Sequence, residues 1–507
     1  MTLNAVQEFF AGDLCDDSGA SNAPHGEPSA QPIRAVAIAG DGIGPEITAA
    51  VKRVLAAAGA PLIWTDCQAG AEVAARGEPS GLPRETVGAI EENGFVLKGP
   101  LATGIGTGGK SANVTLRKHF ELYANVRPAR MLPGVVTPFA GRDIDLVVVR
   151  ENVEDLYAGI EHMQTPDVAQ CLKLITRQGS HKIAEAAFAV ARAEGRRHVT
   201  CASKANIMKL TEGLFKGTLE EVAARHPDIA ASHMLIDNLA HRLVVAPEDF
   251  DVIVTTNMNG DIISDLTAGL VGGLGLAPSA NLGLRAAMFE AVHGSAPDIA
   301  GKGMANPTAL LLAAIMMLRH AGALRCAAAI EHALFVTLEA GEELTPDLAR
   351  PRALQAGSTA AFTDRIVSNL GRRSPSCPSV SRAPLALRAT APSPRRPAHR
   401  EEAGLDVFIE WTGRPEALAA QLQTACAGLP FELQMISNRG LKMFPGPVPQ
   451  ADVVDHWRCR FSHGGGALTA SMTGRLLAAI EGFARWCHVE RLPVFDENPG
   501  YTVAQGQ

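Results

Sequence analysis

The sequence predicts an α/β protein with a large N-terminal part and a small, separate α+β domain at its C-terminal end. Two observations predict this. Short β-type runs alternate with amphipathic helical segments from about residue 33 to residue 370, a pattern typical of α/β domains. A stretch rich in arginine and proline then interrupts the pattern, which resumes near residue 403. A chain of 507 residues is also too long for one compact domain.

The N-terminal segment differs from the rest in composition. Residues 1–30 contain aspartate and glutamate but neither lysine nor arginine, so they resemble no signal or transit peptide. We expect a disordered tail.

The alternation that follows, over residues 31–370, is built from short elements. The β-type runs are Ala35–Ala39, Leu146–Val149, Val199–Ala202 and Val252–Thr255. The helical segments, with apolar residues at three- and four-residue spacing, are Glu46–Ala58, Ser180–Glu194, Lys209–Arg225 and Pro307–Ala321. These helices would cover a sheet.

The interruption is a linker by composition. Between Gly371 and Arg400 lie seven arginines, six prolines and no acidic residue, so residues 371–402 cannot bury enough apolar surface to order themselves. We interpret this Pro/Arg/Ser-rich stretch as a solvated hinge. A role in binding nucleic acid or membrane is the alternative.

Residues 403–507 form the predicted C-terminal α+β domain. Its strands are Asp406–Trp411, Phe431–Ser437 and Trp457–Phe461, and its helices are Pro415–Cys426 and Leu468–Ala484. It carries no recognisable set of catalytic residues, so we expect a role in packing or regulation and not in catalysis.

Charge and cysteine usage exclude several classes of function. The net charge of −7 argues against nucleic acid as a partner. The nine cysteines are scattered, odd in number and never spaced as Cys-x-x-Cys, which indicates neither a disulfide framework nor a zinc site and favours a reducing, cytoplasmic compartment. No apolar run approaches the roughly 20 residues that span a bilayer.

A glycine-rich turn follows the first predicted strand. The segment Gly40-Asp41-Gly42-Ile43-Gly44-Pro45-Glu46 has the strand, turn and helix order of a dinucleotide-binding loop. Pro45, however, replaces the third glycine of that pattern and suits the first turn of a helix. Asp66 lies where a ribose-binding acid would be, but on spacing alone an ordinary strand-to-helix turn is the favoured interpretation.

Three arginines recur among hydroxyl and amide side chains, in the segments Ser111–Arg117, Tyr123–Pro128 and Arg150–Tyr157. Planar, permanently charged guanidinium groups bind carboxylates in bidentate geometry, so Arg117, Arg127 and Arg150 would suit a substrate with several carboxylates. Surface ion pairs are the alternative for each of them.

Two aspartates lie four residues apart in Asn257–Asp265. On a helix, Asp261 and Asp265 would share one face, where their repulsion could be relieved by a hard divalent cation. A solvated helix face is the alternative.

The segment Gly40–Glu46 resembles the N-terminal signature of the β-decarboxylating dehydrogenases, a family that comprises isocitrate, homoisocitrate, isopropylmalate and tartrate dehydrogenases. The resemblance covers roughly residues 33–365. It implies an isocitrate/isopropylmalate dehydrogenase-like fold, which is not a Rossmann fold, with a large subdomain at about 31–122 and 272–370 and a small dimerisation subdomain at about 123–271.

The resemblance implies a substrate and a metal site. Five residues match the substrate positions of isocitrate dehydrogenases: Ser111, Asn113, Arg117, Arg127 and Arg150. Isopropylmalate dehydrogenases place a hydrophobic residue where Ser111 and Asn113 can bind a carboxylate. The metal-site aspartates would be Asp237, Asp261 and Asp265, holding Mg²⁺ or Mn²⁺, and the acid–base pair Tyr157 and Lys204. Asp237 and Lys204 would come from the neighbouring subunit of a homodimer.

The coenzyme is implied in the same way. Glu290–Gly301 and Met304–Pro307 resemble the adenosine-binding loop of the family, which assigns to the coenzyme Thr103, His293, Gly294, Ser295, Ala296, Pro297, Asp298, Ile299 and Asn306. NADP-dependent members carry a Lys-Tyr pair at the positions of Asp298 and Ile299. An aspartate there would accept hydrogen bonds from ribose hydroxyls and repel a 2′-phosphate, which implies NAD.

The expected reaction is therefore the oxidative decarboxylation of isocitrate to 2-oxoglutarate and CO₂ with reduction of NAD⁺. Homoisocitrate or 3-isopropylmalate dehydrogenase is the nearest alternative, and a catalytically silent regulatory subunit is an alternative of another class. The segments Ile436–Gly440 and Val454–His456 resemble an extension of some bacterial isocitrate dehydrogenases. Its role, as an oligomer contact, effector site or partner dock, stays open.

Overall fold

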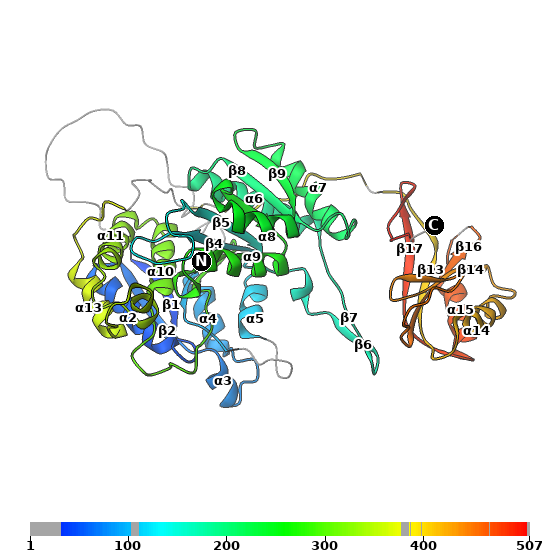
Figure 1. Cartoon of the computed structure of the whole chain (residues 1–507). Coiled ribbons are helices and arrows are strands. Elements are labelled where there is room, and N and C mark those ends of the chain that lie inside the picture. The colour runs from blue at the N-terminus through cyan, green and yellow to red at the C-terminus, as the bar shows by residue number, and fades with distance from the viewer. Residues whose placement is uncertain are drawn as a thin grey trace. The chain divides into compact units, whose positions relative to one another are not determined.

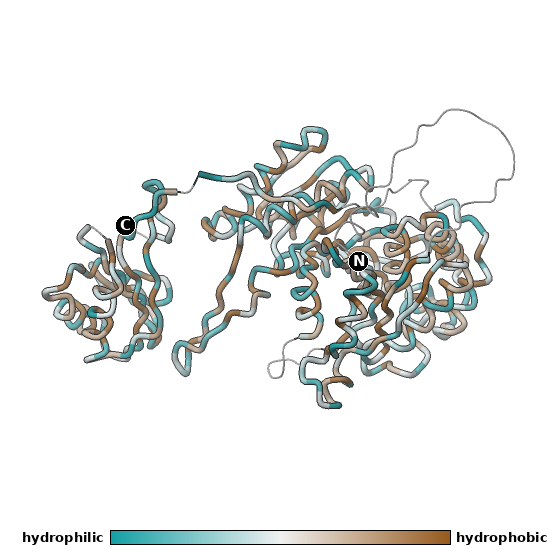
Figure 2. The backbone as a smooth tube through the Cα atoms, turned by 180° about the vertical axis from the view of Figure 1, so that it is seen from behind, coloured by the Kyte–Doolittle hydropathy of each residue, from teal (hydrophilic) through white to brown (hydrophobic). Residues whose placement is uncertain are grey.

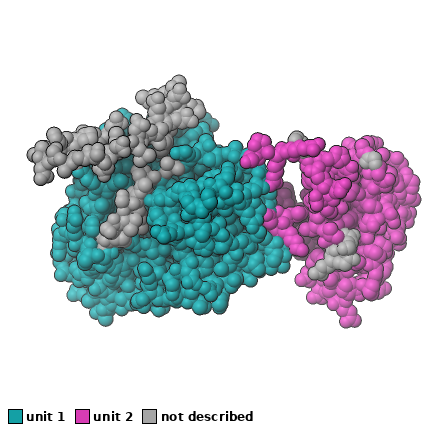
Figure 3. Space-filling view, turned by 90° about the horizontal axis from the view of Figure 1, so that it is seen from above, with its two compact units in different colours: residues 1–157, 175–207, 214–392 teal, residues 158–174, 208–213, 393–507 magenta. Residues whose placement is uncertain are grey.

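A computed structural model describes residues 32–102, 111–376, 385, 387–396, 398–465 and 467–503. The expected N-terminal tail lies outside these residues. The chain divides into two compact units (Figure 3). Unit 1 comprises Met1–Tyr157, Ile175–Ile207 and Leu214–Pro392, and unit 2 comprises Ala158–Leu174, Met208–Gly213 and Ser393–Gln507.

Unit 1 is built on a ten-stranded mixed sheet (Figure 1). Its strands, in sheet order, are β2 (Leu62–Cys67), β1 (Ile33–Ile38), β3 (Phe95–Lys98), β12 (Ala287–Ala291), β11 (Pro278–Leu282), β4 (Ala124–Arg130), β5 (Asp145–Glu151), β10 (Val252–Thr255), β8 (His198–Ser203) and β9 (Ala230–Leu235). The outer strands on each side are parallel, whereas β12, β11, β4 and β5 run antiparallel to one another in the middle. This confirms the predicted α/β class.

Helices cover both faces of this sheet, because each buries one apolar stripe against it. One face carries α2 (Gly44–Ala57), α6 (Arg177–Ala193), α7 (Thr211–Ala223), α10 (Thr308–His320), α11 (Leu324–Ala340) and α13 (Thr359–Ser368). The other face carries α4 (Arg84–Asn93) and α5 (Ala112–His119) over one half and α8 (Ile236–Val245) and α9 (Asn257–Leu270) over the other. Two short helices, α3 (Ala71–Ala75) and α12 (Pro346–Ala349), lie in the connections.

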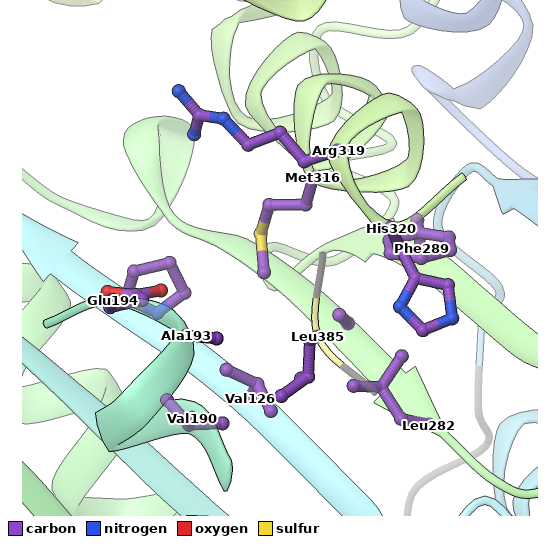
Figure 4. A pocket seen from close by; sticks show the side chains of 12 residues that line it. Val126, Val190, Ala193, Glu194, Leu282, Phe289, Met316, Arg319, His320 and Leu385 are labelled. Atoms are coloured by element: carbon purple, nitrogen blue, oxygen red, sulfur yellow. The ribbon is translucent and has the colours of Figure 1, made fainter. Parts of the chain in front are cut away.

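Strand alternation separates an apolar face from a polar one in the middle of the sheet. On the side of α6 and α10, the strands enclose a small apolar cavity of about 70 Å³ (Figure 4). Leu385 lies in that cavity among Val126, Val190 and Leu282. Leu387 also packs against this core, so part of the stretch that the sequence predicts as a solvated linker is anchored on unit 1. The prediction rests on the average composition of the segment, which is rich in Arg and Pro, and so misses the apolar surface that these two leucines supply.

Unit 2 contains a six-stranded antiparallel sheet with two helices. The strands, in sheet order, are β15 (Leu441–Phe444), β14 (Phe431–Asn438), β16 (His456–His463), β13 (Arg400–Glu410), β17 (Arg485–Phe495) and β18 (Asn498–Pro499). The helices α14 (Pro415–Ala425) and α15 (Ala470–Glu481) pack on a core around the buried Trp457, whose indole N–H donates to Trp411 O at 2.8 Å. The sequence predicts this α+β domain but not β15, β17 and β18.

A hairpin of β6 (Glu161–Thr165) and β7 (Val168–Cys171) belongs to the same unit. The Thr165 hydroxyl donates to the Asp455 carboxylate at 2.9 Å.

Figure 2 shows apolar stretches distributed over many short elements. Within the described part of the chain, no helix is both long and apolar enough to cross a bilayer.

Candidate active site

The glycine-rich turn holds two loops in close contact. A Cβ on Gly42, which has φ +60°, would lie 2.0 Å from Ser295 O, and a Cβ on Gly40 would lie 2.2 Å from Pro100 O. The Asp41 carboxylate accepts backbone N–H groups from Ala71 at 3.0 Å and Ala102 at 2.7 Å. The turn therefore brings α2 against the loop after β12, and its acidic residue is tied to backbone.

A cavity of about 490 Å³ opens beside this turn. Its lining residues come from the turn, from η3 (Leu274–Leu276), from the loop after β12, and from α12 and the residue that follows it: Ile43, Gly275, His293, Gly294, Ala296, Ile299, Met304, Asn306, Pro346, Asp347 and Arg350. Burial lowers the pKa of His293, which therefore stays neutral near pH 7. The Asn306 amide donates to Asp347 at 2.8 Å. This space is apolar with a few fixed polar groups, as in small-molecule and cofactor sites.

The residues that the sequence assigns to the coenzyme fall unevenly around this cavity. Five of them line it: His293, Gly294, Ala296, Ile299 and Asn306. Ser295 contributes its carbonyl to Ile43 N at 2.9 Å, whereas Pro297 and Asp298 are exposed beside the lining. Thr103 lies outside the described residues.

Helix α5 presents the first group of predicted substrate residues. Ser111 is its N-cap residue, and the Asn113 amide makes a long contact of 3.5 Å with Leu101 O. Arg117 reaches the carboxylate of Glu290, with Nη2 and Oε1 3.1 Å apart. Lys98 Nζ lies 2.7 Å from the other oxygen of the same carboxylate. Burial opposes ionisation of Glu290, but the two cations outweigh it and hold the pKa of Glu290 below its usual value.

Arg127 and Arg150, from the adjacent strands β4 and β5, meet the acidic face of α9. The Arg127 guanidinium lies 3.3 Å from Asp261 and 3.5 Å from Asp265. Arg150 is almost fully buried, pairs with Asp261 and donates to Asn257 Oδ1 at 2.8 Å. The two aspartates therefore share one helix face beside two arginines, as their spacing predicts.

Burial and neighbouring arginines shift the pKa of two guanidinium groups in this cluster. Burial lowers the pKa of Arg127, and the neighbouring Arg117 lowers it further, although Asp261 acts in the opposite direction. Burial and the charge of Arg127 lower the pKa of Arg150 to about 10. Three guanidinium groups thus repel one another in a water-poor site, which an anionic ligand would relieve.

Tyr157 completes this cluster from η1 (Leu156–Ala158). Its hydroxyl donates to Asp261 Oδ2 at 2.5 Å, and the Arg150 guanidinium lies 5.0 Å from the centre of its ring. Burial and the hydrogen bond to Asp261 raise the pKa of Tyr157. The phenol is therefore held protonated beside the aspartates.

Lys204 and Asp237 form a separate pair. Lys204 follows β8, Asp237 lies in the first turn of α8, and their Nζ and Oδ1 atoms are 2.6 Å apart. This hydrogen bond lowers the pKa of Asp237. Across the described part of one chain, no three acidic, histidine or cysteine side chains gather as a metal-binding group.

Sequence reasoning missed several residues of the site. Glu290 and Asn257 contact the predicted arginines, Lys98 pairs with Glu290, and Asp347 and Arg350 line the coenzyme-sized cavity. One signal could have found the first two: each is a charged residue in a short, otherwise apolar strand, and a buried charge is costly unless it is paired.

Two family models match the chain. Residues 34–366 match the isocitrate/isopropylmalate dehydrogenase family, and residues 400–507 match the C-terminal domain of bacterial isocitrate dehydrogenase.

Relatives are similar over different spans. The chain is 54% identical over 473 residues to "Isocitrate dehydrogenase [NADP]" of Thermus thermophilus, covering 93% of this chain and 95% of the relative. It is 48% identical over 334 residues to a mitochondrial "Isocitrate dehydrogenase [NAD] regulatory subunit" of Dictyostelium discoideum, covering 66% of this chain and 90% of the relative. A crystal structure of a Thermus thermophilus protein superposes with a TM-score of 0.90 at 53% identity, covering 94% of this chain and 96% of that one. The chain therefore belongs to the isocitrate/isopropylmalate dehydrogenase family and carries the C-terminal domain of the bacterial isocitrate dehydrogenases.

Proposed function

We propose that this protein oxidises isocitrate and removes CO₂ from it to give 2-oxoglutarate, with a nicotinamide coenzyme as hydride acceptor and a divalent cation as cofactor. The observation that carries the proposal is that three arginines, Arg117, Arg127 and Arg150, meet in one water-poor site, where burial and then their mutual repulsion lower the pKa of Arg127 and Arg150. A tricarboxylate would supply acceptors that this group still lacks, because the buried Nε atoms of Arg117 and Arg127 make no hydrogen bond within the described residues.

The helix α5 favours isocitrate over the related substrates. Ser111 and Asn113 lie at its N-terminal end, on the same element as Arg117. The buried Asn113 Oδ1 accepts no hydrogen bond within the described residues, so this amide can reorient toward a ligand. Polar side chains here suit a carboxylate group of the substrate, whereas the alkyl group of 3-isopropylmalate would leave them without partners.

The carboxylates of α9 fit a hard divalent cation, Mg²⁺ or Mn²⁺. Asp261 and Asp265 offer oxygen ligands from one helix face, and the Asp265 side chain is 52% exposed. Burial raises the pKa of Asp265, although the charge of Arg127 lowers it and that of Asp261 raises it again. Asp237 of a second copy would complete the ligand set. A cation bound there would polarise the hydroxyl and carbonyl oxygens of the substrate.

The reaction also needs two proton transfers. One proton must leave the hydroxyl that is oxidised, and one must arrive at the carbon that loses CO₂. Tyr157 Oη and Lys204 Nζ are the proposed acid–base groups. Tyr157 is already positioned by Asp261 and Arg150, whereas Lys204 would reach the site from a second copy of the chain.

The same geometry supports the proposal of a homodimer. In one chain Lys204 and Asp237 pair with each other, while Asp261 and Asp265 pair with Arg127. Large apolar side chains next to these residues are exposed: Ile207 at 70%, Ile262 at 61% and Leu210 at 46%. Exposed apolar side chains beside polar site residues are typical of a subunit interface.

For the coenzyme we propose NAD. Asp298 is exposed beside the cavity that Ile299 lines, and a carboxylate there repels a 2′-phosphate. NADP is the rival, favoured by the name of the Thermus thermophilus relative and by Arg350, a cation in the lining of the same cavity.

A silent regulatory subunit is the rival of another class, since the Dictyostelium discoideum relative is named as one. Competent residues occupy every proposed metal, arginine and acid–base position, which favours an active enzyme. A cytoplasmic location is part of the proposal, supported by the seven described cysteines, all free thiols.

A substrate and coenzyme panel tests the proposal. Full-length protein with Mg²⁺ is offered isocitrate, homoisocitrate and 3-isopropylmalate, each with NAD⁺ and with NADP⁺, and reduced nicotinamide is followed by absorbance. We expect the highest kcat/KM for isocitrate with NAD⁺ and loss of activity with a chelator. Selective turnover of another acid would overturn the substrate, higher kcat/KM with NADP⁺ would overturn the coenzyme, and isocitrate binding without turnover would identify a silent subunit.

A further inference from the structure

One face of the sheet carries a row of polar side chains across neighbouring strands. The register pairs Lys98 of β3 with Glu290 of β12, and Glu290 with Ser279 of β11. It also pairs Asn281 of β11 with Asn125 of β4, and Asn125 with Arg150 of β5. Because side chains alternate along a strand, Ser279 and Asn281 share this face. The opposite face of the same strands is the apolar one of Figure 4.

Asn281 lies in the middle of that row and is completely buried. Its Oδ1 accepts from the amide of Asn125 at 2.7 Å and from the amide of Asn152 at 3.0 Å. Its own amide donates to Glu290 Oε1 at 2.7 Å. A single side chain thus connects four strands, β12, β11, β4 and the end of β5.

Each partner of Asn281 is linked to one of the proposed substrate arginines. Glu290 Oε1, which accepts from Asn281, also lies 3.1 Å from Arg117 Nη2. Asn125 precedes Arg127 by two residues on β4 and therefore shares its face. Asn152 likewise follows Arg150 by two residues. Arg117 therefore shares Glu290 with Asn281, whereas Arg127 and Arg150 lie on the two strands that Asn281 joins through Asn125 and Asn152.

We infer that Asn281 is a positioning residue for substrate binding: its amide fixes Glu290, and through it Arg117, relative to the strands that carry Arg127 and Arg150. The inference rests on the proposed function, because the ligand is taken to be isocitrate. Binding of a polyanion needs several guanidinium groups at fixed separations, so a loss of this link should weaken binding more than it slows the chemical step.

The test compares Asn281→Ala with a matched control elsewhere in unit 1. Asn369 is also buried, and its amide donates one hydrogen bond, to Thr337 Oγ1 at 2.9 Å between α13 and α11. Both changes remove a buried amide, so both should lower Tm by several degrees. Only Asn281→Ala should raise KM and Kd for isocitrate, by about tenfold, with kcat within about threefold of wild type.

A second variant keeps the inference testable if Asn281→Ala folds poorly. Asn281→Asp has the same shape and keeps the acceptor for Asn125 and Asn152, but it places a carboxylate beside Glu290. The other charged groups that face Glu290 are Lys98 and Arg117. Two carboxylates this close share a proton as the pH falls, which restores a donor between them. The ratio of variant to wild-type KM should therefore be larger at pH 8 than at pH 6.5.

Turnover of isocitrate by the wild-type protein is measured first. Its absence would refute the proposed function, and isocitrate would then no longer be the ligand of this inference. With wild-type turnover established, equal KM and Kd in wild type and both Asn281 variants would overturn the inference alone. An equal rise in Asn281→Ala and Asn369→Ala would also overturn it, because the effect would then be one of stability.

Discussion

The proposed preference for NAD depends on one charged residue beside the coenzyme-sized cavity. Asp298 is exposed there, and Ile299 contributes to the lining. We expect the double change Asp298→Lys with Ile299→Tyr to move the ratio of kcat/KM for NADP⁺ over NAD⁺ upward by at least about tenfold, because a phosphate-pairing cation replaces a repelling anion.

The control for that change lies in the same cavity. Arg350→Ala should lower the same ratio if Arg350 pairs with the 2′-phosphate of NADP⁺, and should leave it unaltered if Arg350 makes no such contact. A double variant whose coenzyme ratio equals that of wild type would contradict the role proposed for Asp298.

At the residue scale, sequence reasoning found the groups that would touch substrate but not the groups that hold them. Arg127, Arg150 and Asp261, which it picked out, do lie together. Glu290 and Asn281 escaped it, because their partners come from strands far away in the chain and only the sheet register brings them together. The resemblance to the family assigns residues to substrate, metal and coenzyme, whereas the contacts that hold those residues in place are seen only in the structure.

At the scale of elements, the turn between β1 and α2 is a stability feature. Gly42 has φ +60° and would place a Cβ 2.0 Å from Ser295 O, whereas Gly59 has φ +67° and no atom near its Cβ position. Gly59→Ala should therefore lower the free energy of unfolding by only about 1 kcal/mol, which is the cost of placing a Cβ in the left-handed conformation. Gly42→Ala should lower the free energy of unfolding several-fold more, because the backbone at Ser295 must also move to make room for the Cβ.

Urea denaturation of the two glycine variants measures this difference as a shift in midpoint. Equal shifts would mean that the contact with Ser295 is not rigid. The coenzyme KM should also rise in Gly42→Ala alone, since Ile43 and the loop after β12 line the same cavity.

The elements that the sequence predicts well are those with simple apolar patterns. The expected run Val252–Thr255 coincides with β10, and the expected helix Pro415–Cys426 differs from α14 by one residue. Strand β4 is harder because its site-facing residues are polar and it contains Pro128. Strand β17 mixes charged residues with a proline, so it has no clear alternation. Polar site residues in β4 and the mixed composition of β17 both remove the alternation of apolar and polar residues on which strand prediction depends.

At the scale of the whole molecule, the boundary of unit 1 lies beyond the end of its last helix. Leu385 and Leu387 pack against the core of unit 1. A chain that ends at residue 372 should therefore have a lower Tm than one that ends at residue 392, because burial of a leucine contributes about 1.5–3 kcal/mol. Full-length Leu385→Ala should lose part of the same stability. Identical Tm values for the two truncated chains would contradict this packing.

The central claim is that isocitrate is oxidised in a site that two copies of the chain complete. Tyr157→Phe and Lys204→Met each remove one acid–base group, and each homodimer should lose at least about 100-fold in kcat. A mixed dimer, however, would contain one site with the wild-type Tyr157 of one copy and the wild-type Lys204 of the other.

The most direct measurement is therefore the isocitrate dehydrogenase activity of the two inactive variants after they are unfolded and refolded together in equal amounts. Random pairing makes half of the dimers mixed, each with one intact site, so recovery of about a quarter of wild-type activity is predicted. Separate refolding of each variant is the control and should recover none. Absence of recovery in the mixture, with mixed dimers shown to have formed, would contradict the shared site.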